Sequence, residues 1–205
     1  MAHDERKWHR RLFRTAHRLL LERAIFGQLP GLTGEVLVIG AGYEPYRRML
    51  TGARGVCLTD IDPANNAVDR QMDAHEITFA DESFDSVLAI EVFEHLRRPA
   101  VAAAEIRRVL RPGGTCLLSI PFLFRVHGDP FDFQRLTGSG LEELFRDFSR
   151  VSVVGFGRRS HVISDIVTTG SRALVPLRIV NHLLARLPAG PSHDSPSGYI
   201  VRLVK

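Results

Sequence analysis

The sequence has little cysteine and no long apolar run. Its 205 residues include only two cysteines, Cys57 and Cys116, which are too few for a disulfide scaffold or a multi-cysteine zinc module. Both lie in apolar, strand-like segments, so we expect reduced core residues. The sequence contains no run of about 18 apolar residues that could form a transmembrane helix. Its first residues, MAHDERKWHRR, lack the apolar centre of a secretory signal. We therefore expect a cytoplasmic protein.

The net charge of +4 is concentrated in one segment. Residues 1–30 carry seven basic and three acidic side chains, and the remaining 175 residues are balanced. A neutral body makes nucleic acid an unfavoured partner. Apolar residues recur at helical spacing within the basic segment and predict an amphipathic helix over residues 5–26. We treat residues 1–30 as one unit and residues 31–205 as a domain.

Strand-like and helical segments alternate after residue 31. Strands are predicted at 35–39, 55–60, 84–90, 115–120, 151–156 and 198–204, and helices at 45–50, 98–111 and 139–148. Arg111-Pro112-Gly113-Gly114 is a stop signal for the second helix, and Ser139 with Glu142 is a capping box for the third. This alternation predicts an α/β fold with a mostly parallel sheet. An apolar segment with helical spacing, about residues 160–190, is predicted as an insertion.

Ligands of parallel sheets bind beyond the carboxyl ends of the strands. Gly40-Ala41-Gly42 follows the first strand, where glycine lets a ligand approach the backbone and exposes N–H groups. Pro45 stands where a nicotinamide dinucleotide fingerprint has its third glycine, so pyrophosphate binding is unfavoured. Asp60 ends the second strand and can accept hydrogen bonds from ribose hydroxyls. A simple turn aspartate would give the same local pattern.

A larger set of segments follows in a characteristic order. These are Val36–Asp60, Asp73-Ala74-His75, Phe84-Asp85-Ser86-Val87, Glu91-Val92-Phe93-Glu94-His95-Leu96 and Val109-Leu110-Arg111-Pro112-Gly113-Gly114. Over about residues 33–157 the chain resembles the class I S-adenosylmethionine-dependent methyltransferases, in particular the small bacterial type 11-like family. The resemblance implies a Rossmann-like sheet of seven strands flanked by helices, with residues 198–201 in the last strand.

The resemblance implies S-adenosylmethionine as cofactor and assigns roles to eight residues. The loop Gly40, Ala41 and Gly42 would face the methionine part, Asp60 would hold the ribose, and Ile61 would lie against the adenine. Asp73 and the Ala74 N–H would bind the adenine edge, and Ile90 would lie near the sulfonium. The family usually has an acidic residue where this sequence has Val38, and that loss would weaken the hold on the cofactor's amino group.

The stretch 121–135 carries the candidate chemistry for the methyl acceptor. It combines histidine, aspartate and arginine with four phenylalanines, which favours a partly apolar pocket. An oxygen or nitrogen acceptor needs positioning and can need a general base. We predict His127, with Asp132, in preference to His95. His127 could instead be a turn residue, and Arg135 could simply pair with Asp132. No metal site is predicted.

The predicted function is methyl transfer from S-adenosylmethionine to a small-molecule or lipid- or glycan-linked acceptor. One alternative is an RNA or protein methyltransferase that docks through the basic helix. Another, motivated by Val38, is a non-catalytic module that binds the cofactor. The segments 5–26 and 160–190 could cover the site as a lid. They could also form a surface for peripheral contact with an anionic membrane, which would place the protein at the inner membrane face.

Overall fold

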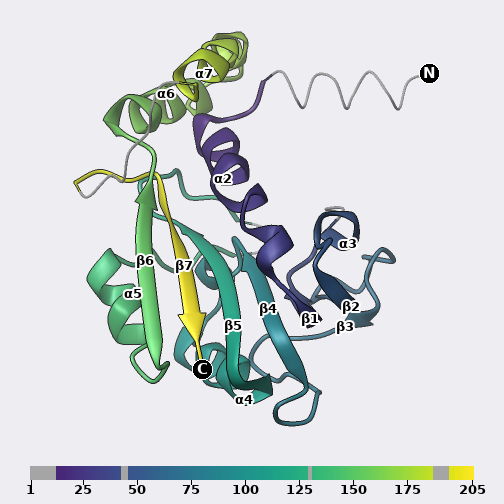
Figure 1. The fold of residues 1–205 in the computed structure, drawn as a ribbon. Helices are drawn as coiled ribbons and strands as arrows, with labels where there is room; N and C mark the ends of the chain where they lie inside the picture. Colours follow the sequence, from purple (N-terminus) through teal and green to yellow (C-terminus); the bar gives the residue numbers. More distant parts are fainter. Residues whose placement is uncertain (1–12, 43–45, 129–130, 187–193) are drawn as a thin grey trace.

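A computed structural model describes residues 13–42, 46–128, 131–186 and 194–205 (Figure 1). Seven strands form one sheet in the order β3-β2-β1-β4-β5-β7-β6. β7 runs antiparallel to both of its neighbours, and the other pairs are parallel. The strands are β1 (Gly34–Ile39), β2 (Ala53–Asp60), β3 (Arg70–Gln71), β4 (Phe84–Ile90), β5 (Leu110–Pro121), β6 (Arg150–Phe156) and β7 (Gly198–Val204). The predicted α/β class and the seven-stranded, mostly parallel sheet are confirmed.

The two faces of the sheet bury separate hydrophobic clusters. Successive side chains of a strand point to opposite faces, so Leu37 and Ile39 of β1 join one cluster while Val36 and Val38 join the other. One face is covered by α4 (Pro99–Val109) and α5 (Gly138–Leu144). The other is covered by α2 (Ala16–Phe26), the 3-10 turn η1 (Leu29–Gly31) and α3 (Tyr46–Met49). Burial on both faces explains the uninterrupted apolar runs 36–39 in β1 and 87–90 in β4.

Two signals that were predicted to mark helix boundaries do not do so. The Pro-Gly-Gly stop signal lies inside β5, and α4 already ends at Val109. Phe84 pairs with Leu110 and Ser86 with Thr115, so the intervening residues of β5 form an irregularity between two paired stretches. The predicted capping box of Ser139 is also wrong. The N-cap is Thr137, whose hydroxyl accepts the backbone N–H of Gly140, so the cap lies two residues before Ser139.

The N-terminal helix is shorter than its hydrophobic pattern suggested. Residues 5–12 lie outside the described part of the chain, and residues 13–15 are not helical. α2 begins at Ala16 because the hydroxyl of Thr15 accepts the N–H of Arg18. The carboxylate of Asp165 accepts the first two N–H groups of the helix, those of Ala16 and His17, at 2.7 Å each. A distant side chain therefore fixes where this helix starts.

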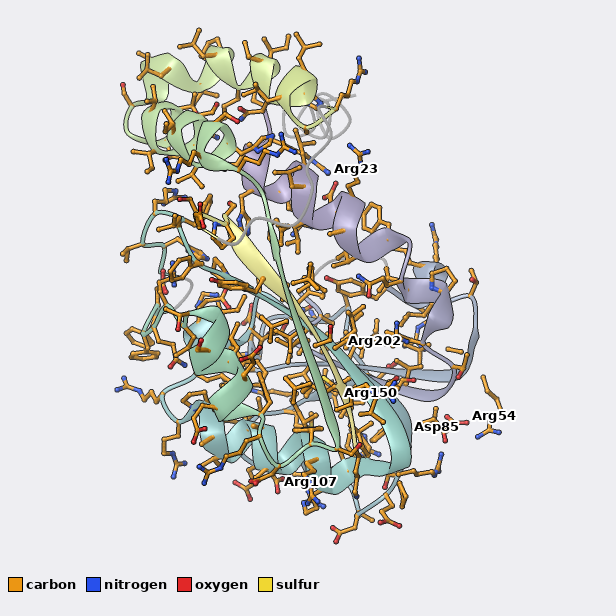
Figure 2. All side chains as sticks on the ribbon, turned by 60° about the vertical axis from the view of Figure 1, so that its left-hand side comes forward. Arg23, Arg54, Asp85, Arg107, Arg150 and Arg202 are labelled. Carbon is orange, nitrogen blue, oxygen red and sulfur yellow. The ribbon has the colours of Figure 1, made fainter. Side chains whose placement is uncertain are left out.

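Residues 159–184 form a helical cap beyond the end of β6, beside the start of α2 (Figure 1). The cap comprises α6 (Arg159–Thr169), the 3-10 helix η3 (Arg172–Arg178) and α7 (Ile179–Leu184). Arg23 of α2 donates to the carbonyl of Ala185, which ties α2 to the end of α7 (Figure 2). No helix in the described ranges is long and apolar enough to cross a membrane.

The amino ends of the strands are joined by satisfied ion pairs. Asp85 at the start of β4 lies 2.7 Å from Arg111 and 3.7 Å from Arg54, toward which it points in Figure 2. It also accepts the N–H of Glu35 at 2.7 Å. The hydrogen bonds of Arg111 and Glu35 lower the pKa of Asp85 below its ordinary value. These contacts therefore stabilise the amino ends of the strands.

Replacing Asp165 tests how much the cap stabilises the fold. Asp165→Ala leaves two buried N–H groups at the start of α2 without their acceptor, and we expect the free energy of unfolding to fall by about 1–3 kcal/mol. Urea unfolding followed by circular dichroism measures the change. Asp147→Ala is the control, because its side chain is 82% exposed, and it should change stability by less than about 0.5 kcal/mol. Equal effects would contradict the capping role.

Candidate functional site

The glycine loop adopts a backbone conformation that favours glycine. Gly40 and Gly42 have φ angles of +64° and +53°, in the left-handed region. A Cβ on Gly40 would lie 2.6 Å from Val92, whereas a Cβ on Gly42 would meet nothing within 4 Å. Ala41 between them is buried. The loop therefore turns tightly against the residues after β4 and leaves open space beside Gly42. Pro45 lies outside the described residues.

Asp60 is brought to this loop, as the sequence predicted from the strand order. Its Oδ2 accepts the N–H of Gly42 at 2.7 Å, across 18 residues of sequence. Its Oδ1 accepts the N–H of Asp62 at 3.0 Å. A carboxylate offers about four acceptor sites, so Asp60 retains capacity for the two hydroxyls of a ribose. The carboxylate is thus held in place by backbone bonds at the end of β2.

The segments proposed to bind adenine lie side by side. The N–H of Met72 donates to the carbonyl of Asp60 at 2.7 Å, which places Asp73 and Ala74 beside Ile61. Ile61 is an apolar side chain with 55% of its surface exposed. An exposed aliphatic group beside two carboxylates offers the apolar contact and the acceptors that an adenosyl group needs. The residues present therefore fit the adenosyl part of S-adenosylmethionine.

Asp73 is already engaged by its neighbour His75. Its Oδ1 accepts the N–H of His75 at 2.8 Å and lies 2.6 Å from Nδ1 of that ring. Partial burial alone would raise the pKa of Asp73, but the hydrogen bonds and charge of His75 outweigh it and lower the pKa. Asp73 is therefore ionised at neutral pH and accepts hydrogen bonds only.

Glu91 occupies the position directly after β4 and was not predicted as a site residue. Its φ of +54° is a strained value for a glutamate, and such strain gathers at functional positions. Its Oε1 accepts the hydroxyl of Ser119 at 2.8 Å, and its Oε2 accepts Nε2 of His17 at 3.0 Å. Burial would raise the pKa of Glu91, but the charge and hydrogen bond of His17 outweigh it and lower the pKa.

His17 brings the N-terminal helix into the site. Its ring is 3% exposed, and Nδ1 lies 2.8 Å from the hydroxyl of Ser197. The ring centroid lies 4.6 Å from that of Phe124 and 5.1 Å from that of Phe156. The start of α2 is therefore a wall of the site, packed against the strand ends.

Glu94 is a buried acid whose carboxyl group has no hydrogen-bond partner in the described chain. Its side chain is fully buried, and neither carboxylate oxygen has a hydrogen-bond partner in the described chain. Nε2 of His95 lies 3.6 Å from Oε1 of Glu94, and Nε2 of His127 lies 3.9 Å from the same oxygen. Burial, and then the nearby Glu91 carboxylate, raise the pKa of Glu94 to about 9. A buried carboxyl group without partners is costly to fold and is a common sign of function.

The two residues predicted for acceptor chemistry are brought together. The N–H of His127 donates to Oδ2 of Asp132 at 2.9 Å, and Nδ1 of its ring lies 3.3 Å from the same oxygen. Arg135 pairs with Asp132, as the structural alternative anticipated. Burial lowers the pKa of His127, so the ring is neutral at pH 7. Burial would raise the pKa of Asp132, but the hydrogen bond of Arg135 outweighs it and keeps this carboxyl ionised.

Two other positions complete the comparison with the sequence. Val38 is buried in the core, and Ile90 is buried at the end of β4.

The sequence does carry one signal that points to Glu91 and Glu94, the acids that were not predicted. Glu91-x-x-Glu94-His95 directly follows the apolar run 87–90, so its three ionisable groups are expected at the carboxyl ends of the strands.

Comparison with known proteins gives the same assignment. Residues 37–118 match the family model of a methyltransferase domain, type 11. An uncharacterized methyltransferase of Mycobacterium marinum is 32% identical over 101 residues, which cover 43% of this chain. The match covers 40% of that relative, so the chain spans about two fifths of the length of the curated protein.

Solved structures share the fold over almost the whole chain. A methyltransferase of Thermotoga maritima gives a TM-score of 0.59 at 19% identity, over 98% of this chain and 95% of that one. The methyltransferase bound to the Trm112 activator of Haloferax volcanii gives the same score and identity, over 98% and 91%. At this identity both show the fold alone. Residues 37–118 therefore match a methyltransferase domain family, and the chain has the fold of S-adenosylmethionine-dependent methyltransferases.

Proposed function

We propose that the protein transfers a methyl group from S-adenosylmethionine to a small-molecule or lipid- or glycan-linked acceptor. The observation that carries this proposal is the bond between Asp60 and the N–H of Gly42, which assembles an acidic, glycine-lined edge at the ends of β1 and β2. The ends of the next two strands carry Glu91 and Glu94, after β4, and His127, after β5. A donor site and a set of ionisable groups therefore lie on neighbouring strands, as transfer between two bound molecules requires.

The chain's part in cofactor binding is to hold the adenosyl group. When bound, S-adenosylmethionine supplies a methyl group that is already activated by its sulfonium. Asp60 would accept the ribose hydroxyls, Ile61 would cover one face of the adenine, and Asp73 and Ala74 would bind its edge. Gly40, Ala41 and Gly42 would line the methionine part, with Ile90 near the sulfonium. The buried Val38 offers no charge there, so binding rests on the other contacts.

The chain's part in activating the acceptor falls to His127. Its Nδ1 faces Asp132 and the carbonyl of Arg125, so its proton belongs on that nitrogen and the lone pair lies on Nε2. The Nε2 atom faces the interior of the cluster, 3.9 Å from Glu94. We propose that this lone pair activates a hydroxyl or amine of the acceptor and that Asp132 keeps the ring in place.

The helical cap supports a lipid-linked acceptor. Its buried side chains are largely polar, and they include His161, Asp165 and Asn181. Its exposed side chains include seven large apolar residues: Ile163, Ile166, Val167, Leu177, Ile179, Val180 and Leu183. Soluble helices normally bury their apolar face. A helix pair that exposes it, above the acceptor site, suits peripheral contact with the inner face of a membrane.

The described basic residues favour this reading over docking to RNA. Arg14, just before α2, and Arg18 within it both form ion pairs with Glu22, so part of the positive charge at the start of the helix is neutralised. An RNA-docking arm depends on basic side chains that can reach phosphates. The apolar surface of the cap is the more distinctive feature, and its contribution to binding does not depend on these arginines.

Removing Asp60 tests the cofactor assignment. Asp60→Ala should weaken S-adenosylmethionine binding by about 1–3 kcal/mol, roughly 5–150-fold in Kd, because the ribose hydroxyls lose a charged acceptor. Isothermal calorimetry measures the change. Asp73→Ala should cost less, because the Ala74 N–H remains. Asp62→Ala is the control two residues away, and an equal loss in both Asp60 and Asp62 variants would reject the ribose role.

Removing the His127 ring tests acceptor activation. His127→Ala should lower turnover by roughly 10²–10⁴-fold while the Kd for S-adenosylmethionine changes less than about twofold. The rate is measured as tritiated methyl transferred from the cofactor to a bacterial total-lipid extract. A variant that folds normally and transfers methyl groups at the parent rate would return His127 to a structural role.

Vesicle sedimentation tests the membrane surface. We expect the protein to sediment with anionic vesicles and less with neutral ones, because both apolar contact and residual positive charge contribute. Val167→Asp places a charge on the exposed apolar face of α6 and should reduce the bound fraction several-fold. Val154→Asp is a matched control, since Val154 on β6 is 46% exposed and Val167 is 48% exposed. Equal binding of all three proteins would leave the cap as a lid.

A further inference from the structure

We infer that Glu94, His95 and His127 bind a divalent transition-metal ion at the end of β4. No metal site was predicted from the sequence, in which only His95 adjoins Glu94. The fold brings His127 to them from the loop after β5. One ligand atom from each residue lies within 4.8 Å of the others. Two imidazoles and one carboxylate form a ligand set typical of zinc, iron and related ions.

The distances leave room for one ion. Bonds from zinc to nitrogen and oxygen are about 2.0–2.2 Å long, so ligand atoms on one ion lie roughly 3 Å apart. Oε1 of Glu94 is 3.6 Å from Nε2 of His95 and 3.9 Å from Nε2 of His127. These separations exceed a hydrogen bond and are slightly wider than a metal-bound set. A shift of under about 1 Å for each side chain would close the site around an ion.

Contacts outside the cluster turn both lone pairs inward. Nδ1 of His95 donates to the carbonyl of Phe131. Nδ1 of His127 lies 3.4 Å from the carbonyl of Arg125 and 3.3 Å from Asp132. A nitrogen that faces a carbonyl carries the ring proton, which leaves Nε2 of each histidine as an acceptor. Metal-binding histidines are oriented by this kind of backbone or carboxylate contact.

The burial of Glu94 without a hydrogen-bond partner is the observation that points to a bound ion. Its carboxylate is fully buried, and the described chain offers neither oxygen a hydrogen bond. The nearest polar atoms are the Nε2 lone pairs of the two histidines, at 3.6 and 3.9 Å, which is beyond hydrogen-bond distance. A cation between the carboxyl group and the two nitrogens would give all three a partner. Arg135 does not fill this role, because its side chain is bonded to Asp132.

The ion would also narrow the acceptor class. Three protein ligands leave coordination positions open, and a hard or borderline cation favours an oxygen ligand there. The acceptor would then be a molecule that presents a hydroxyl group, and the ion held by His127 would lower the pKa of that hydroxyl in place of the free Nε2 lone pair. This second part rests on the proposed function, whereas binding of the ion does not.

Metal titration of the full-length, untagged chain tests the site. After dialysis against chelator, Zn²⁺ is titrated by calorimetry without cofactor or acceptor, and we expect one ion per chain. Glu94→Gln and His127→Gln should each weaken the Kd at least about 100-fold, and Asp132→Asn should weaken it about 10–100-fold. His75→Gln is the matched control, because His75 also pairs with a carboxylate but lies outside the cluster.

Thermal unfolding gives a second readout, which can also be applied to variants that bind no zinc. Zn²⁺ should raise the unfolding midpoint of the parent and of His75→Gln. Glu94→Gln should fold at least as stably as the metal-free parent, because it removes a buried carboxyl group, and should show no zinc-dependent shift. Absence of stoichiometric binding, or equal binding by Glu94→Gln and His127→Gln, would overturn the assignment. Because no S-adenosylmethionine is present, either result leaves the test of Asp60 independent.

Discussion

The buried carboxylate of Asp165 fixes the start of α2, and the rest of the site depends on that placement. By accepting the N–H groups of Ala16 and His17, it ends the irregular segment and starts the helix at the carboxyl edge of the sheet. His17 then reaches Glu91, and Glu91 reaches Ser119 on β5. One line of hydrogen bonds therefore joins the helical cap, the N-terminal helix and two central strands. The segments outside the common fold take part in building the site as well as covering it.

Acidic side chains have opposite environments at the amino and carboxyl ends of the strands. At the amino ends, Asp85 has arginine partners and a lowered pKa. At the carboxyl ends, Glu94 is buried without a partner, and Asp60 holds the glycine loop while keeping spare acceptor capacity. Stability is thus secured at one edge, and the unsatisfied groups are gathered at the other. Ligand binding is the physical process that would satisfy them.

Much of the fold could be predicted from the sequence because its signals are local. The strands 84–90 and 198–204 were located correctly, and Gly42 and Asp60 were placed at the ends of two strands, where the structure joins them by a hydrogen bond. The features that the sequence did not reveal depend on long-range contacts. His17 meets Glu91 across 74 residues, and Asp165 caps α2 across 148 residues, so no local pattern could reveal either. Glu94 was missed because the sequence does not show that its carboxyl group is buried without hydrogen-bond partners.

The central claim is that the ends of β1, β2 and β4 form one donor and acceptor site. A crystal structure of the protein with S-adenosylhomocysteine, the demethylated form of the cofactor, tests it most directly. The account predicts the ribose on Asp60, the adenine against Ile61, and the sulfur directed toward the end of β4 near Ile90 and Glu91. Density for the ligand elsewhere on the molecule, or a ribose that does not contact Asp60, would contradict it.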